Sequence, residues 1–145
     1  MLAVLDRLSR LPGVDVERNR RAPVDGALDR PLLNLMDGGH TADTPDSSDA
    51  LYSLQLLIDM TVPAETDAEL GPALAGLYGR VLRCLQTDPA TGATDFSLGG
   101  LCSDVRERGF DVRILPAEES AAPLAECSLD LLADFRTLDG NPYSL

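Results

Sequence analysis

Hydrophobic and polar residues alternate along several stretches of the chain, the period at which strand side chains point to opposite faces of a sheet. The clearest stretches are residues 14–19, 51–62 and 127–136. Shorter extended stretches bounded by Gly or Pro are expected at residues 32–36, 101–107 and 110–115. The polar segments between them, including residues 40–49, are expected to be loops.

A different spacing, three or four residues between apolar positions, predicts two helices. The first lies within residues 1–11 and ends before Pro12 and Gly13. The second extends to residue 85, with an apolar stripe formed by Leu70, Leu74, Leu77, Val81 and Leu85. Thr66 and Glu69 match a capping box at its start, and Pro72 removes one hydrogen bond from its first turns.

The order of these elements predicts an α+β fold. Helix, three strands, helix and three strands follow one another within 145 residues, a length suited to one domain. We therefore expect residues 1–145 to form a single domain, with a mostly antiparallel sheet and two helices packed on one face. Residues 138–145 follow the last strand and are expected to form an apolar-tipped C-terminal tail.

The charge balance excludes one broad class of function. Twelve basic residues, all of them arginine, stand against 24 acidic ones, which gives a net charge of −12 with the single histidine neutral. Binding to a phosphate backbone requires clustered cations that release counterions. A chain this acidic is therefore not expected to bind DNA, RNA or an anionic membrane by charge.

The cysteines and the first residues bear on the compartment. The three cysteines are widely spaced among apolar neighbours, which predicts buried, reduced thiols at Cys84, Cys102 and Cys127. The apolar run in residues 1–11 is interrupted by charges and is far shorter than the roughly 20 residues that span a bilayer. No membrane partner is predicted, and synthesis in a reducing cytoplasm is expected.

The sequence holds little catalytic chemistry. His40 is the only histidine, and no Gly-x-Ser-x-Gly motif accompanies it. Asp37, Asp43, Asp46 and Asp49 could suggest calcium, but they lack the spacing, the central Gly and the closing Glu of an EF-hand loop, so a solvated acidic loop is preferred. We predict no enzyme, no cofactor and no metal site.

Arg18, Arg20 and Arg21 form the one local concentration of positive charge. One interpretation is that these arginines make ion pairs with carboxylates of the same surface. The other is that they dock on an acidic partner, for which the forked donors of arginine are suited. The residues alone leave both interpretations open.

Two stretches near the start of the chain carry a family resemblance. They are VERNRRAPV at residues 16–24 and LLNLMDGG at residues 32–39. A late alternating strand that ends in DFRT at residues 134–137, followed by DGNPY at residues 139–143, extends it. Together these features resemble the tail terminator family, the tail-completion proteins of long-tailed bacteriophages and of phage-derived gene transfer agents. The order and length of the elements match across nearly all of the chain.

The resemblance implies a structural protein. Tail terminators form a ring, usually of six subunits, that sits on the last ring of the tail tube, stops its growth and presents its other face to the head-tail connector. The expected partners are further copies of the chain, the tail tube protein and the connector or stopper protein, with DNA only in passage through the channel. The expected location is the head-tail junction of a virion or phage-like particle, made in a bacterial host cytoplasm.

The negative charge suits that role. Six copies of a chain with net charge −12 would carry −72. Carboxylates that face the channel would repel DNA phosphates and let DNA slide without sticking.

A closed ring requires a heterologous interface, in which one patch meets a different patch on the neighbour. The location of these contacts is inferred from position along the chain, because no family motif identifies them. A sheet edge and the tail, residues 138–145, are the segments expected to bind a neighbouring copy or the tube. In the tail, the residues expected to make this contact are Leu138, Tyr143 and Leu145. Vertical contacts are expected from the arginine turn and from the acidic loop, through Arg18, Arg20, Arg21, Asp43, Asp46 and Asp49.

Three other functions remain open from the residues. The nearest is a head-closure or connector protein of the same particle. The next is a small acidic cytoplasmic module that binds a ligand or a peptide on its sheet. A small hydrolase that uses His40 with the acidic loop is the least favoured, because no further catalytic group is apparent.

Overall fold

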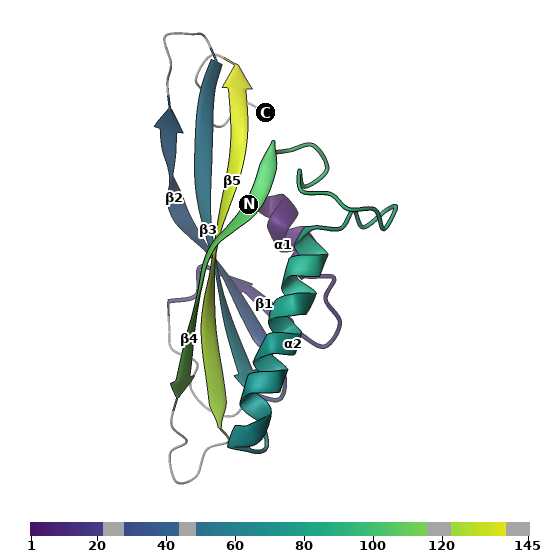
Figure 1. Cartoon of the computed structure of the whole chain (residues 1–145), viewed down its shortest axis with the longest axis vertical. Coiled ribbons are helices and arrows are strands. Elements are labelled where there is room, and N and C mark those ends of the chain that lie inside the picture. The colour runs from purple at the N-terminus through teal and green to yellow at the C-terminus, as the bar shows by residue number, and fades with distance from the viewer. Residues whose placement is uncertain (22–27, 44–48, 116–122, 139–145) are drawn as a thin grey trace.

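Five strands form one sheet and two helices pack against it, within the residues that the computed structural model describes, 1–21, 28–43, 49–115 and 123–138 (Figure 1). In chain order the elements are α1 (Leu2–Leu8), β1 (Asp15–Arg18), β2 (Leu32–Asp43), β3 (Asp49–Pro63), α2 (Asp67–Leu85), β4 (Asp104–Leu115) and β5 (Leu124–Leu138). The predicted single α+β domain with a mostly antiparallel sheet is confirmed.

The strand order β1-β2-β3-β5-β4 places β3 in the middle, between β2 and β5, and puts β1 and β4 at opposite edges. β3 and β5 pair along their whole length, from Asp49 beside Leu138 to Pro63 beside Leu124. β1 is the exception to the antiparallel arrangement, because it runs parallel to the first residues of β2. The two edge strands therefore differ in direction of pairing, since β1 pairs in parallel with β2 and β4 pairs antiparallel with β5.

The bounds predicted for the loop, residues 40–49, are wrong at both ends. β2 continues through Gly38 and Gly39 to Asp43, and β3 already begins at Asp49. The pairing of β2 with β3 shifts register between Asp37 and His40, so a bulge takes up the two glycines. Gly39 has a φ of 90°, a conformation that side chains rarely adopt, which explains how a turn-like sequence lies within a strand.

A bulge also corrects the prediction of two short strands at residues 101–107 and 110–115. They form one strand, β4, whose pairing with β5 shifts between Glu107 and Gly109. The sheet accordingly has five strands instead of six. The first helix is shorter than expected, because after Leu8 the chain continues in tighter turns that include a hydrogen bond from the Leu11 N–H to the Leu8 carbonyl.

The second helix begins as the capping pattern predicts. The Glu69 carboxylate accepts a hydrogen bond from the Thr66 N–H at 3.2 Å, and Pro72 lies inside the helix without ending it. The apolar stripe from Leu70 to Leu85 is buried along its whole length. α2 packs on β3 and β5, and α1 packs on α2 and β1.

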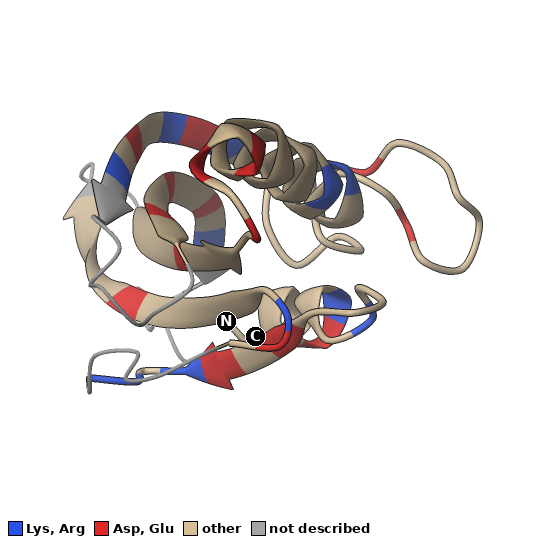
Figure 2. Cartoon of the chain, turned by 90° about the horizontal axis from the view of Figure 1, so that it is seen from below, with Lys and Arg blue, Asp and Glu red and all other residues tan. Residues whose placement is uncertain are grey.

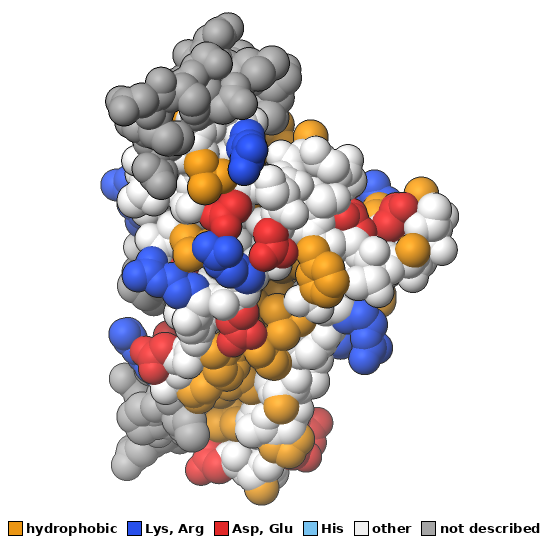
Figure 3. Space-filling model, turned by 45° about the horizontal axis from the view of Figure 1, so that its top comes forward, with side chains coloured by type: hydrophobic (Ala, Val, Ile, Leu, Met, Phe, Trp, Pro, Cys, Tyr) orange, Lys and Arg blue, Asp and Glu red, His pale blue; other side chains and the backbone are white. Residues whose placement is uncertain are grey.

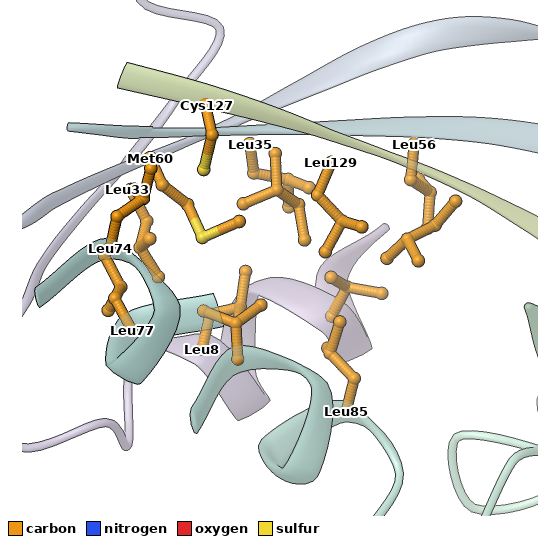
Figure 4. Close-up of a cluster of buried hydrophobic side chains, with 14 of the residues drawn as sticks. Leu8, Leu33, Leu35, Leu56, Met60, Leu74, Leu77, Leu85, Cys127 and Leu129 are labelled. Atoms are coloured by element: carbon orange, nitrogen blue, oxygen red, sulfur yellow. The ribbon is translucent and has the colours of Figure 1, made fainter. Parts of the chain in front are cut away.

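The core lies between the two helices and one face of the sheet (Figure 4). Leu8 from α1 and Leu85 from α2 point toward sheet residues such as Leu35 and Leu129, and all four are at most 1% exposed. The even-numbered residues of β3 contribute Leu56, Ile58 and Met60, as the alternation predicted. The opposite face of the sheet, which we call the open face, carries mostly polar side chains.

Candidate interaction surfaces

The arginine turn lies at the end of β1, beside β2. Arg18 pairs with Asp37 at 3.1 Å and Arg20 pairs with Glu17 at 3.1 Å, both near the surface. The backbone N–H of Arg20 donates to the Asn34 Oδ1 at 3.0 Å, and the Asn34 amide donates back to the Arg20 carbonyl at 3.0 Å. The turn is therefore fixed to β2, and Arg18 and Arg20 have intrachain ion pairs, as the first interpretation expected.

The acidic loop and the tail residues meet at the other end of the sheet. Asp43 and Asp49 end β2 and begin β3, and Leu138, the last residue of β5, pairs with Asp49. The predicted interface residues thus fall into two groups, one at the arginine turn and one at this far end. Asp46, Tyr143 and Leu145 lie outside the described residues.

A row of aromatic rings crosses the sheet near this far end. His40 lies with its ring 5.7 Å from that of Tyr52, and Tyr52 stacks on Phe135 with the ring centres 5.5 Å apart. This row was not predicted from the sequence, because His40 was expected to lie in a loop. The alternation of β3 and β5 could have paired Tyr52 with Phe135, but only the bulge in β2 brings His40 beside them.

The open face carries a ladder of polar contacts along β5. The Asp134 carboxylate accepts a hydrogen bond from the Ser53 hydroxyl and pairs with Arg106 at 2.8 Å. One oxygen of Asp130 accepts from the Gln55 amide at 3.0 Å. Alternating charges continue along β4, where acidic and basic positions follow one another (Figure 2).

A surface cavity of about 520 Å³ lies on the open face, at the end nearer the arginine turn. Its lining combines three arginines, Arg20, Arg21 and Arg113, with the carboxylates of Asp59, Asp111 and Glu126. Such a mixed lining suits a polar ligand or peptide that offers both charges. The lining carboxylates and arginines come from three strands and the arginine turn, so the fold brings them to one place on the surface.

A strip of apolar surface follows β4 on the side of the helices. Phe110 and Val112 are 39% and 47% exposed, although their partners across the ladder, Leu129 and Cys127, are buried. Tyr78 of α2 lies against Phe110, with the rings 4.5 Å apart, and its hydroxyl donates to Glu107 at 2.7 Å. Figure 3 shows hydrophobic side chains gathered in a band on this part of the surface.

Metal ligation and thiol chemistry depend on where the described part of the chain places its His, Cys, Asp and Glu side chains. The described residues contain no group of three or more His, Cys, Asp or Glu side chains that could hold a metal ion. Burial raises the pKa of Cys84 and Cys102, and it raises that of Cys127 to about 12, which keeps these thiols protonated and weakly nucleophilic. Cys127 is buried as predicted, while Cys84 and Cys102 are half-buried.

No helix within the described ranges is long and apolar enough to cross a membrane. The chain matches no protein-family model, and no curated protein matches it.

Proposed function

We propose that the chain is a tail terminator, a structural protein that forms a ring on the tail tube of a phage-like particle, stops tube growth and joins the tail to the head-tail connector. One observation carries the proposal. The two stretches that resemble the family, at residues 16–24 and 32–39, include neighbouring strands, since β1 pairs with the start of β2 from Asp15 beside Leu32 onward. The resemblance therefore follows a structural unit and not scattered positions.

The contacts within this unit support the same proposal. Arg18 and Asn19, from the first stretch, both donate to the Asp37 carboxylate of the second, at 3.1 and 3.3 Å. The two stretches that carry the family resemblance are thus joined to each other by hydrogen bonds. They hold the arginine turn in a fixed position on the surface, where Arg21 can meet an acidic partner.

The experiment is a capping assay with purified protein and assembled tail tubes of the same particle. Light scattering would follow tube growth, and negative-stain imaging would show the tube ends. We expect the protein to bind one end of each tube and to stop elongation. Tubes that elongate unchanged, with bare ends, would exclude the terminator function.

Two variants localise the contact. Arg21→Ala removes a charge of the arginine turn and is expected to weaken binding to the tube or the connector. Arg83→Ala is the matched control, because it removes an exposed arginine of α2, away from that turn. A chain that lacks Leu138–Leu145 tests the tail, and we expect it to fold as a monomer but to lose stable attachment to the tube or the connector.

The cavity on the open face favours a second candidate, a small module that binds a polar ligand or peptide. Its test is a screen of short peptides of mixed charge by nuclear magnetic resonance, with the amide signals of Asn34 and Ser128 as reporters, because both residues line the cavity. Saturable shifts confined to these signals would support this function. Unchanged signals together with tube capping would exclude it.

A further inference from the structure

The apolar strip exists because the helices cover only part of the sheet. α2 packs on β3 and β5, so the core face of the sheet continues past the helix onto β4. Phe110 and Val112 lie on this continuation and remain exposed, whereas Val105, further toward the start of β4, is buried. An apolar area at the edge of a folded domain that no described segment covers is typical of an interaction surface.

The helix side of the strip is formed by uncharged residues, and a carboxylate of β4, that of Glu107, accepts a hydrogen bond from the Tyr78 hydroxyl there at 2.7 Å. Gly71, Ala75 and Tyr78 share one flank of α2, since they are separated by four and three residues. A methyl group placed on Gly71 would meet no atom within 4 Å, so the flank leaves open space beside the strand. We call the surface formed by these three residues with Phe110 and Val112 the α2/β4 strip.

Charge indicates which occupant this strip can accept. Residues 1–21 hold five arginines and three acidic residues, a net charge of +2. Arg7 is buried against Asp95, so the surface of this part carries four arginines and three acidic residues, a net charge of +1. α2 has two acidic and two basic residues, and β4 has three of each, so both are neutral. In a chain of net charge −12, the neutral strip and the positive N-terminal part are the surfaces on which two copies repel each other least.

These two surfaces lie on opposite flanks of the molecule. α1 packs on β1, and the strand order puts β1 and β4 at opposite edges of the sheet. Figure 2 likewise shows the N-terminus on the side away from β4 and α2. On the N-terminal flank, Leu2 of α1 is 71% exposed, the most exposed large hydrophobic residue of the described chain.

We propose that the α2/β4 strip of one copy binds the α1/β1 flank of a second copy, with Leu2 entering the space beside Tyr78 and Val112. The contact is heterologous, so each copy has one flank of each kind and can bind a neighbour on both sides. The inference rests on the proposed function in one respect, because a ring requires a contact of this kind.

The test uses two variants that each disable one flank. Val112→Glu introduces a charge in the strip, and Leu2→Glu introduces one on the other flank, where a carboxylate at the first residue of a helix favours folding. We expect wild-type protein to self-associate in sedimentation velocity, and each variant alone to associate at least about tenfold more weakly. Mixed in equal amounts, the variants should form dimers and nothing larger, because one intact pair of flanks remains.

Two further variants control for folding and for general polarity. Val112→Thr keeps a β-branched residue in the strand and should weaken association less than Val112→Glu. Leu101→Glu changes a residue of similar exposure, 49%, in the loop before β4 and should associate like wild type. Circular dichroism and thermal melting verify that all variants fold.

The outcomes separate this inference from the proposed function. The inference would be overturned by wild-type protein that stays monomeric at all concentrations, or by an equal mixture of the two variants that forms assemblies larger than dimers. If Val112→Glu still assembles into rings that cap tubes, the interface is wrong and the terminator function stands. If wild type assembles through these flanks but ignores tubes, the function is wrong and the interface stands.

Discussion

Replacement of Arg7 by Met should destabilise the fold far more than its place in a short N-terminal helix suggests. The Arg7 side chain is only 6% exposed. Its guanidinium donates to the carbonyl oxygens of Leu85 at 2.7 Å and Thr87 at 3.0 Å, and it pairs with Asp95. One side chain therefore joins α1 to the end of α2 and to the loop that follows.

The magnitude follows from the groups that the substitution leaves behind. Methionine has a similar length and fills much of the space, but it donates no hydrogen bond. Two carbonyls lose bonds from a charged donor, and the one at Leu85 also loses a cation at the C-terminal end of a helix. Removing one partner of a buried charged contact typically costs about 3–5 kcal/mol, which for a domain of this size lowers the melting temperature by about 10–15 °C.

The assay is urea unfolding followed by far-ultraviolet circular dichroism, with Arg10→Met as the matched control. Arg10 lies in the same N-terminal segment and pairs with Asp6 at 2.7 Å, but its side chain is 56% exposed. An exposed pair four residues apart contributes at most about 0.5 kcal/mol. If Arg7→Met costs no more than Arg10→Met, the proposed role of Arg7 as the joint between the helices is refuted.

Further predictions concern acid stability, two glycines and a thiol. Hydrogen bonds from Ser97, followed by the one from Arg7, hold the pKa of the Asp95 carboxyl well below its usual value. The ionised carboxylate therefore adds to the free energy of unfolding above about pH 4, and this contribution is lost as the pH falls further. The Asp95→Asn variant should accordingly lose stability less steeply than wild type between about pH 4 and 2. Gly79→Ala, in open space on α2, should raise the free energy of unfolding by about 0.5–1 kcal/mol. Gly38→Ala should lower the free energy of unfolding by about 1–2 kcal/mol, because the new Cβ would lie 2.8 Å from the Gln55 side chain. Urea unfolding measures the effect of both glycine substitutions. Iodoacetamide should label Cys127 only in denaturant, as mass spectrometry would show, since burial raises its pKa to about 12.

The sequence predicted best where one period continues without interruption. The alternation of β3 and the apolar stripe of α2 each identify a face, and that face is buried in the fold. Glu69 also occupies its expected place at the start of α2. In each case local geometry alone decides which side chains point inward, so no knowledge of distant contacts is needed.

The predictions failed where glycine interrupts a strand. Gly38, Gly39 and Gly109 indicated turns, yet each lies in or beside a bulge of a continuous strand. A bulge depends on the neighbouring strand, which keeps pairing on both sides of the irregularity. A sequence window contains only one of the two strands, so it cannot distinguish a bulge from a turn.

The interaction surfaces were still harder to predict from the sequence, because they depend on tertiary structure. Alternation along β4 places Phe110 and Val112 on the face that elsewhere forms the core, but their exposure follows from where α2 crosses the sheet. Arg7 likewise interrupts an apolar run, and its partners lie 78 to 88 residues away in the chain. Such partners are set by packing and leave no local pattern.

The distribution of charge connects the two proposals. A large negative charge suits a channel through which DNA slides, but the same charge opposes the assembly of copies into a ring. The excess of arginine in residues 1–21 and the neutral charge balance of α2 and β4 reduce that opposition at the two flanks that we propose to be in contact. The repulsion that remains acts at longer range and is screened by salt, so self-association through these flanks should strengthen, and not weaken, as the ionic strength rises from low values toward about 0.15 M.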